Sequence, residues 1–200
     1  MKLIPHNFFF LLLGLALAPG LVRAASLTDV GLPTTPTSYV TDAARVLSAT
    51  DRANLETQIT QLRQATGAEI AVATIETLGD NTLEETAVRV FQTWGIGKAK
   101  ADNGLLILLA KAERKVRIEV GYGLEPVITD LASKQIINDY FIPAFRTGDY
   151  GGGLQSGLAA LGQLISTGEV PPLESPPTNP NRSWLDILSH LGFFIFLIPT

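Results

Sequence analysis

The chain has 200 residues, of which 46% are apolar and 17% charged, and its formal net charge is −4. This length allows one globular domain with appendages, and the acidic balance excludes the electrostatic attraction that nucleic-acid binding needs. The chain has no cysteine, and its two histidines, His6 and His190, lie near its ends. Disulfides, Ser-His-Asp catalysis and Cys-His catalysis are therefore excluded, and a zinc site in the folded domain is disfavoured.

Residues 1–24 are typical of a secretory signal peptide. Lys2 supplies the positive start, residues 8–17 are an uninterrupted apolar run, and Val22 and Ala24 occupy the −3 and −1 positions of a cleavage site. An uncleaved anchor is the alternative, but the run is short for a membrane span. We therefore expect export to a periplasm or a thylakoid lumen, with residues 25–38 as a lead segment.

The first half of the folded domain, which we place at residues 39–168, predicts a helix, a strand and a second helix. Ser48 and Asp51 form an N-cap signal before apolar residues at helical spacing. Residues 69–77 are an apolar, β-rich run typical of a buried strand, and residues 82–85 are a capping box. The stripe that follows predicts a helix packed on the sheet: Leu83, Ala87, Val90, Phe91 and Trp94.

The second half predicts a hairpin and two helices. Residues 104–110 are a buried strand, and the alternation in residues 115–121 predicts an antiparallel partner. Thr129 caps a helix that ends near Pro143. Residues 151–153 are three glycines before the last helix, and they form either a flexible entry or an anion cradle. The apolar residues of these two helices are Ile136, Ile137, Tyr140, Phe141, Leu154, Leu158, Leu161 and Ile165.

This order predicts an α/β fold. The strand-helix-strand unit implies parallel strands, and the hairpin adds an antiparallel one. The result is a three-layer α/β/α sandwich with a small mixed sheet flanked by helices on both faces. The same connectivity places the loop before the second strand and the loop after the third strand at one pole of the sheet.

This pole is the best candidate site. Asp102, Asn103, Glu125 and Asp130 offer hard oxygen ligands, which suit Ca²⁺, with Mg²⁺ as the alternative. Ordinary turn chemistry and helix-start preference are the competing explanation for the same residues. Asp42 stays open, because the chain can simply turn there before the first helix.

The loop after the third strand has two further features. Gly121 and Gly123 do not match a dinucleotide fingerprint, so no organic cofactor is expected, and they permit either a positive φ or a close backbone approach. Tyr122 between them is expected to be exposed, where it would offer a contact to a partner.

Basic residues form two groups at opposite poles, and the simplest interpretation is solvated loops. Lys98 and Lys100 precede the second strand, where they could also serve a phosphate beside a metal. The other group surrounds the hairpin and comprises Lys111, Arg114, Lys115 and Arg117.

The C-terminal end predicts a membrane tether. Residues 169–183 contain five prolines and form a semi-rigid linker. Residues 184–200 start at Trp184, and residues 192–199 within them are an apolar run. They could form an interfacial helix, begin a spanning helix or dock on a partner, and we expect membrane association.

Several segments in this order resemble the TPM domain family over residues 39–167. Singly each motif is weak, but their joint order and spacing are specific. They are Val40-Thr41-Asp42, Thr66-Gly67-Ala68-Glu69, Trp94-Gly95-Ile96-Gly97, Asp102-Asn103-Gly104, Arg117 to Glu125, Thr129-Asp130, and Pro143-Ala144-Phe145-Arg146 with Gly148-Asp149-Tyr150. The whole arrangement is similar to the cyanobacterial and plastid lumenal members linked to photosystem II repair.

The resemblance implies two classes of function. One is an accessory protein that is tethered to a membrane and assists a membrane protein complex, and some family members have calcium sites. The other is an acid phosphatase, an activity attributed to the plastid type, which would act on phosphomonoesters with a metal ion. The sequence carries no phosphatase signature, so the accessory role is the preferred hypothesis. The oligomeric state stays open.

Overall fold

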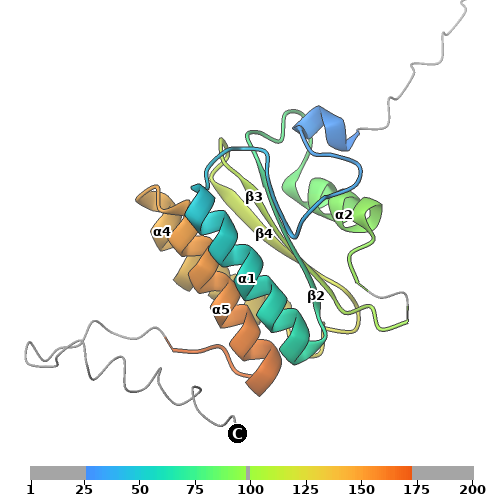
Figure 1. Cartoon of the computed structure of the whole chain (residues 1–200), viewed down its shortest axis with the longest axis vertical. Helices are drawn as coiled ribbons and strands as arrows, with labels where there is room; N and C mark the ends of the chain where they lie inside the picture. The colour runs from blue at the N-terminus through green and yellow to red at the C-terminus, as the bar shows by residue number, and fades with distance from the viewer. Residues whose placement is uncertain (1–25, 98–99, 173–200) are drawn as a thin grey trace, which may run out of the picture.

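The computed structural model describes residues 26–97 and 100–172 (Figure 1). The predicted signal peptide, the apolar tail and most of the Pro-rich linker lie outside these residues. Among the helices of the described part, none is long and apolar enough to cross a membrane.

A four-stranded sheet in the order β1-β2-β3-β4 forms the middle layer. The strands are β1 (Val40–Asp42), β2 (Glu69–Ile75), β3 (Gly104–Ala110) and β4 (Lys115–Val120). The first three are parallel and β4 is antiparallel to β3, so the predicted mixed sheet is confirmed. Strand β1 was not predicted, because three residues are too few to show an alternating pattern.

Helices cover both faces of the sheet (Figure 1), which confirms the three-layer α/β/α fold. One face carries α1 (Ala49–Thr66), α3 (Asp130–Ile136), the π-helical turn η2 (Ile137–Phe141), α4 (Ile142–Arg146) and α5 (Tyr150–Thr167). The other face carries α2 (Leu83–Trp94) and the short 3₁₀ helix η1 (Leu27–Val30).

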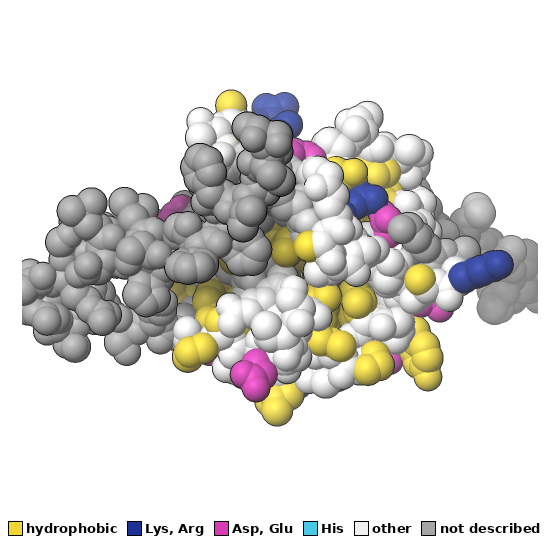
Figure 2. Space-filling model, turned by 60° about the horizontal axis from the view of Figure 1, so that its bottom comes forward, with side chains coloured by type: hydrophobic (Ala, Val, Ile, Leu, Met, Phe, Trp, Pro, Cys, Tyr) yellow, Lys and Arg dark blue, Asp and Glu magenta, His cyan; other side chains and the backbone are white. Residues whose placement is uncertain are grey.

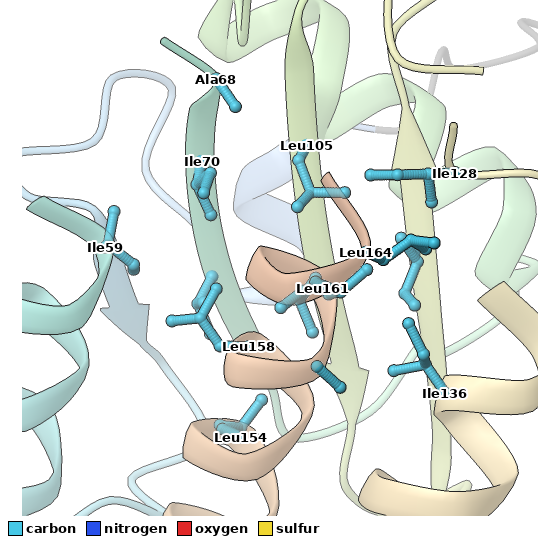
Figure 3. Packing of buried hydrophobic residues seen from close by; sticks show 14 of the residues in the cluster. Ile59, Ala68, Ile70, Leu105, Ile128, Ile136, Leu154, Leu158, Leu161 and Leu164 are labelled. Carbon is cyan, nitrogen blue, oxygen red and sulfur yellow. The ribbon is translucent and has the colours of Figure 1, made fainter. Parts of the chain in front are cut away.

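The alternation of the strands divides the apolar core in two. On β2, Ile70 and Val72 join the cluster under α1 and α5, whereas Ala71 and Ala73 join the cluster under α2. Figure 3 shows the larger cluster, in which one side of α5 faces the sheet. The buried α5 residues in it are Leu154, Leu158, Ala160, Leu161 and Leu164, all at most 2% exposed. A sheet buried on both faces explains why β2 and β3 appear in the sequence as continuous apolar runs.

The helix starts follow the sequence signals. Ser48 and Thr82 cap α1 and α2 with complete capping boxes, and Thr129 caps α3. The stripe of α2 is buried at its start, whereas Trp94 is half-buried and its Nε1 donates to the Pro33 carbonyl at 2.8 Å. This hydrogen bond joins α2 to the segment that enters the domain.

One helix boundary differs from the prediction, and another agrees with it. The three glycines lie inside the first turn of α5 and not before it, because Gly151 and Gly153 pack directly against Asp51 of α1 and Phe145 of α4. The helical stretch begun by Asp130 has Pro143 near its end, as predicted, and it runs through η2 and α4 to Arg146. The π-helical turn precedes Pro143, and that proline lies in the first turn of α4, where a missing N–H group is tolerated.

The hairpin between β3 and β4 is fastened to the loop after β2 by Glu113. Its carboxylate accepts hydrogen bonds from the Thr77 hydroxyl at 2.7 Å and from the Leu78 N–H at 3.0 Å. Burial raises the pKa of Glu113, but these hydrogen bonds, its own N–H and the charge of Lys115 outweigh burial, so the pKa is lowered from 4.5.

This shift predicts an acid-dependent loss of stability. A folded-state pKa below the unfolded one stabilises the domain above the unfolded pKa, and the contribution disappears as the pH falls through the folded pKa. Between about pH 5 and pH 3 the full chain should therefore lose more stability than its Glu113→Gln variant. Urea unfolding at several pH values measures the free energy of unfolding of both proteins. The same pH dependence in the wild type and in Glu113→Gln would contradict the stabilising role of the Glu113 carboxylate.

Candidate functional site

The loops before β3 and after β4 meet at one pole of the sheet, at the bottom of Figure 1. The Gly121 N–H donates to the Gly104 carbonyl at 2.8 Å, and the Gly123 N–H donates to the Asp102 carbonyl at 3.0 Å. Asp102 has a φ of 44°, which an Asp tolerates better than most residues. The predicted meeting of these two loops is therefore present in the backbone.

Close backbone approach explains the two glycines of this pole. Neither Gly121 nor Gly123 has a positive φ. A Cβ at Gly121 would overlap the carbonyl oxygen of Asp102, and one at Gly123 would overlap that of Ala101. Of the two alternatives, close approach is correct and positive φ is wrong.

Glu125 and Asp130 line one pocket of about 400 Å³ beside the free edge of β4. Glu119 and Arg117 lie in the same pocket, and the Arg117 Nε to Glu119 Oε2 distance is 2.8 Å. Asp130 stands in the first turn of α3, just after the capping Thr129. The pocket thus holds three carboxylates and one guanidinium, and Asp130 also interacts favourably with the helix N-terminus.

The other two predicted ligands lie outside this pocket. Asn103 donates its side-chain N–H to the Gly67 carbonyl at 2.6 Å, which ties the β3 start to the end of α1. Asp102 is exposed. Within residues 26–97 and 100–172, no three or more His, Cys, Asp or Glu side chains form a group that could hold a metal. A cation at the pocket would therefore use at most two protein carboxylates at once, with carbonyl oxygens and water completing its shell.

Two large hydrophobic side chains project from the same pole. Tyr122 is 78% exposed and Leu131, the residue after Asp130, is 77% exposed. Figure 2 shows the molecule with the bottom of Figure 1 turned forward; yellow hydrophobic side chains are spread over this surface, with magenta acidic and dark blue basic side chains among them. The expected exposure of Tyr122 is confirmed. The exposure of Leu131 was not predicted, and it contrasts with its neighbours Ala132 and Ser133, which are half-buried and buried.

Asp42 has a structural role at the other end of the sheet. Its side chain is 1% exposed and lies 3.6 Å from Arg52. It accepts hydrogen bonds from Val46 N–H at 3.1 Å, Leu47 N–H at 3.0 Å and the Thr74 hydroxyl at 2.5 Å. These contacts fix the connection from β1 to α1.

A pocket of about 530 Å³, which was not predicted, lies beside the start of β2. Arg63 lines it, stacks over the Tyr39 ring at 4.3 Å and forms an ion pair with Glu69. Its walls combine α1, β2 and the end of α2, three elements whose proximity depends on the whole fold.

Comparison with known proteins places this architecture in a family. Residues 40–164 match the family model described as the TPM domain and named TPM_phosphatase. The N-terminal domain of a protein from P. gingivalis, solved by NMR, is 36% identical with a TM-score of 0.61, and the match covers 70% of this chain and 85% of that one.

Two other NMR structures share the fold. The N-terminal domain of the cg2496 protein from Corynebacterium glutamicum is 20% identical, with a TM-score of 0.52 and coverage of 76% of this chain and 95% of that one. The BA42 protein from the psychrophilic Bizionia argentinensis is 23% identical, with a TM-score of 0.54, and the match covers 68% of this chain and 92% of that one. No curated protein matched. The family model covers more than half of the sequence, so the chain belongs to the TPM domain family.

Proposed function

We propose that the chain is an exported, membrane-tethered accessory protein that assists assembly or repair of a membrane protein complex such as photosystem II. In this proposal the acidic pole, defined as Tyr122, Glu125, Asp130 and Leu131, is the surface that contacts the complex. The predicted signal peptide would deliver the domain to the thylakoid lumen or periplasm, and residues 184–200 would hold it at the membrane.

The observation that carries the proposal is the exposure of Tyr122 and Leu131 next to carboxylates. About four fifths of each of these large side chains is exposed to water. Covering such apolar surface with a partner lowers the free energy of the complex. Tyrosine is enriched at interfaces because its ring is apolar and its hydroxyl can hydrogen-bond. The acidic neighbours would favour a basic surface on the partner.

Recovery of photosystem II activity after photodamage tests this role in a photosynthetic host that lacks the chain. The wild-type chain and the Val88→Ser variant should both restore recovery, because Val88 is exposed to 37% on α2, away from the pole. The Tyr122→Ser/Leu131→Ser double variant should not restore it. Full recovery with the double variant would reject the acidic pole as the working surface.

A divalent cation at Glu125 and Asp130 is a separate part of the proposal. Their chemistry suits Ca²⁺ or Mg²⁺, and the pocket leaves room for the water that a cation with few protein ligands needs. A bound cation would reduce the repulsion between the two carboxylates. It would bind only the folded protein, because only the fold brings the two residues together.

Thermal unfolding of the full chain should therefore respond to Ca²⁺ at fixed ionic strength. At 100 times its dissociation constant the cation should stabilise the fold by about 2.7 kcal/mol. Glu125→Gln with Asp130→Asn should remove most of this response, and Asp102→Asn, outside the pocket, should keep it. Equal stabilisation of the wild type and the double variant by Ca²⁺ would show that Glu125 and Asp130 do not bind the cation and have turn and capping roles alone.

The second candidate is a metal-assisted phosphatase, which the name of the matching family model favours. Glu119, Glu125 and Asp130 would provide the base or the nucleophile in the pocket. Turnover of a generic phosphomonoester by the purified chain, dependent on Ca²⁺ or Mg²⁺ and abolished by Asp130→Asn, would support this candidate. No turnover with either cation would leave the accessory role.

A further inference from the structure

A small pocket at the pole opposite the acidic one has apolar walls and a basic rim. Its volume is about 240 Å³, and it is lined by Leu109, Arg114, Ile142, Phe145, Arg146 and Tyr150. Leu109 is the last residue but one of strand β3, Arg114 lies in the hairpin, and the other residues belong to α4 and the start of α5. None of these residues takes part in the function proposed above.

The walls are suited to an apolar group of limited size. Leu109 is completely buried, and the Phe145 and Tyr150 rings pack at 5.4 Å between centroids with a 34° tilt. A dry cavity of about 150 Å³ is known to hold benzene, whereas drug-sized ligands use about 300–1,000 Å³. A pocket of about 240 Å³ thus fits one ring with a short polar extension.

The rim is suited to an anion. Within the described part of the chain, Arg114 and Arg146 have neither an ion-pair nor a side-chain hydrogen-bond partner. Neither neighbouring acid forms an ion pair with them: Glu113 accepts through Oε1 from Thr77 and Leu78, and Asp149 accepts from the Gly152 N–H at 2.9 Å. Guanidinium groups match the planar geometry of a carboxylate and can bind it through two parallel hydrogen bonds.

The backbone at Arg114 supports this assignment. Its φ is 54°, a left-handed conformation that disfavours a long side chain and favours Gly, Asn or Asp. The hairpin therefore carries an arginine where turn chemistry alone would select a smaller residue, and this arginine lines the pocket.

We propose that this pocket binds a small organic acid with an apolar body about the size of one ring, whose carboxylate pairs with Arg114 and Arg146. The apolar walls take the ring and the two guanidinium groups take the charge. We assign a free small acid, because a volume of about 240 Å³ is filled by one ring and its short carboxylate extension and needs no further chain.

Amide chemical-shift titration of the ¹⁵N-labelled full chain tests the proposal with three probes. The probe 3-phenylpropanoate should shift signals of the hairpin and of the first turn of α5. The neutral 3-phenylpropanamide, which lacks the charge, and acetate, which lacks the ring, should each bind about tenfold more weakly. Equal affinity for the acid and its amide would overturn the proposal, as would no saturable shift with the acid.

Matched variants show whether the two arginines carry the affinity. Arg114→Asn, which tolerates the positive φ, and Arg146→Gln should each weaken 3-phenylpropanoate binding about tenfold. The control is Arg45→Asn, which removes the same charge at a φ of 53° outside the pocket, and it should bind normally. Unchanged binding in both pocket variants, or an equal loss in the control, would overturn the proposal.

A peptide with a C-terminal phenylalanine tests whether the carboxylate comes from a free small acid or from the C-terminus of a polypeptide. It should bind no more tightly than 3-phenylpropanoate, because its chain lies outside the pocket. A peptide that binds more than tenfold tighter and depends on Arg114 and Arg146 would overturn the assignment to a free small acid.

Discussion

Gly121→Ala should destabilise the domain by about 3 kcal/mol or more. A Cβ at this buried position would overlap the backbone carbonyl of Asp102 and come within 3.0 Å of the Gly104 nitrogen. Backbone atoms cannot rotate away as side chains do, so the end of β4 and the start of β3 would have to separate. Urea unfolding of the full chain measures the loss.

Gly79→Ala is the matched control for this substitution. Gly79 has a φ of 58° and open space around its Cβ position, so alanine there should cost about 1–2 kcal/mol from backbone strain alone. If Gly121→Ala lost no more stability than Gly79→Ala, the loops before β3 and after β4 could move apart at little cost in free energy.

Asp42→Ala should cost about 3–5 kcal/mol. The substitution leaves the N–H groups of Val46 and Leu47 and the hydroxyl of Thr74 without their acceptor. The two N–H groups lie in the partly buried connection from β1 to α1, and the Thr74 hydroxyl lies on β2. An unpaired group at such a place loses its hydration as well as its bond. Denaturant unfolding of the full chain again provides the measurement.

Asp80→Ala serves as the comparison for Asp42→Ala. Asp80 is an exposed acid in the loop after β2, and its removal should change the free energy of unfolding by less than about 0.5 kcal/mol. If the two variants were equally stable, the hydrogen bonds of Asp42 would contribute no net stability and β1 would be held by other contacts.

Local patterns were sufficient to predict most of the fold. Two kinds of pattern involve only a few neighbouring residues each: the capping boxes at Ser48 and Thr82, and the apolar runs of β2 and β3. The structure confirms both kinds. The prediction failed where distant contacts decide. Strand β1 exists because Val40 pairs with Val72, and α5 begins early because its glycines pack on α1 and α4.

The candidate site was predictable to a smaller extent. Connectivity indicated that the loops of Asp102 and Glu125 meet, and they do. It could not indicate that Asn103 uses its amide on Gly67, nor that Glu125 and Asp130 share a pocket with Glu119. Such partners depend on side-chain directions set by packing between elements far apart in the sequence.

Site-specific photo-crosslinking in a photosynthetic host tests directly the proposed contact between the acidic pole and a membrane complex. The photo-reactive residue p-benzoylphenylalanine is placed either at Tyr122 or, as the control, at Val88, another exposed hydrophobic position. The account predicts crosslinks to photosystem II subunits from position 122 and none from position 88. Equal crosslinking from both positions, or none from position 122 while the chain remains at the membrane, would contradict it.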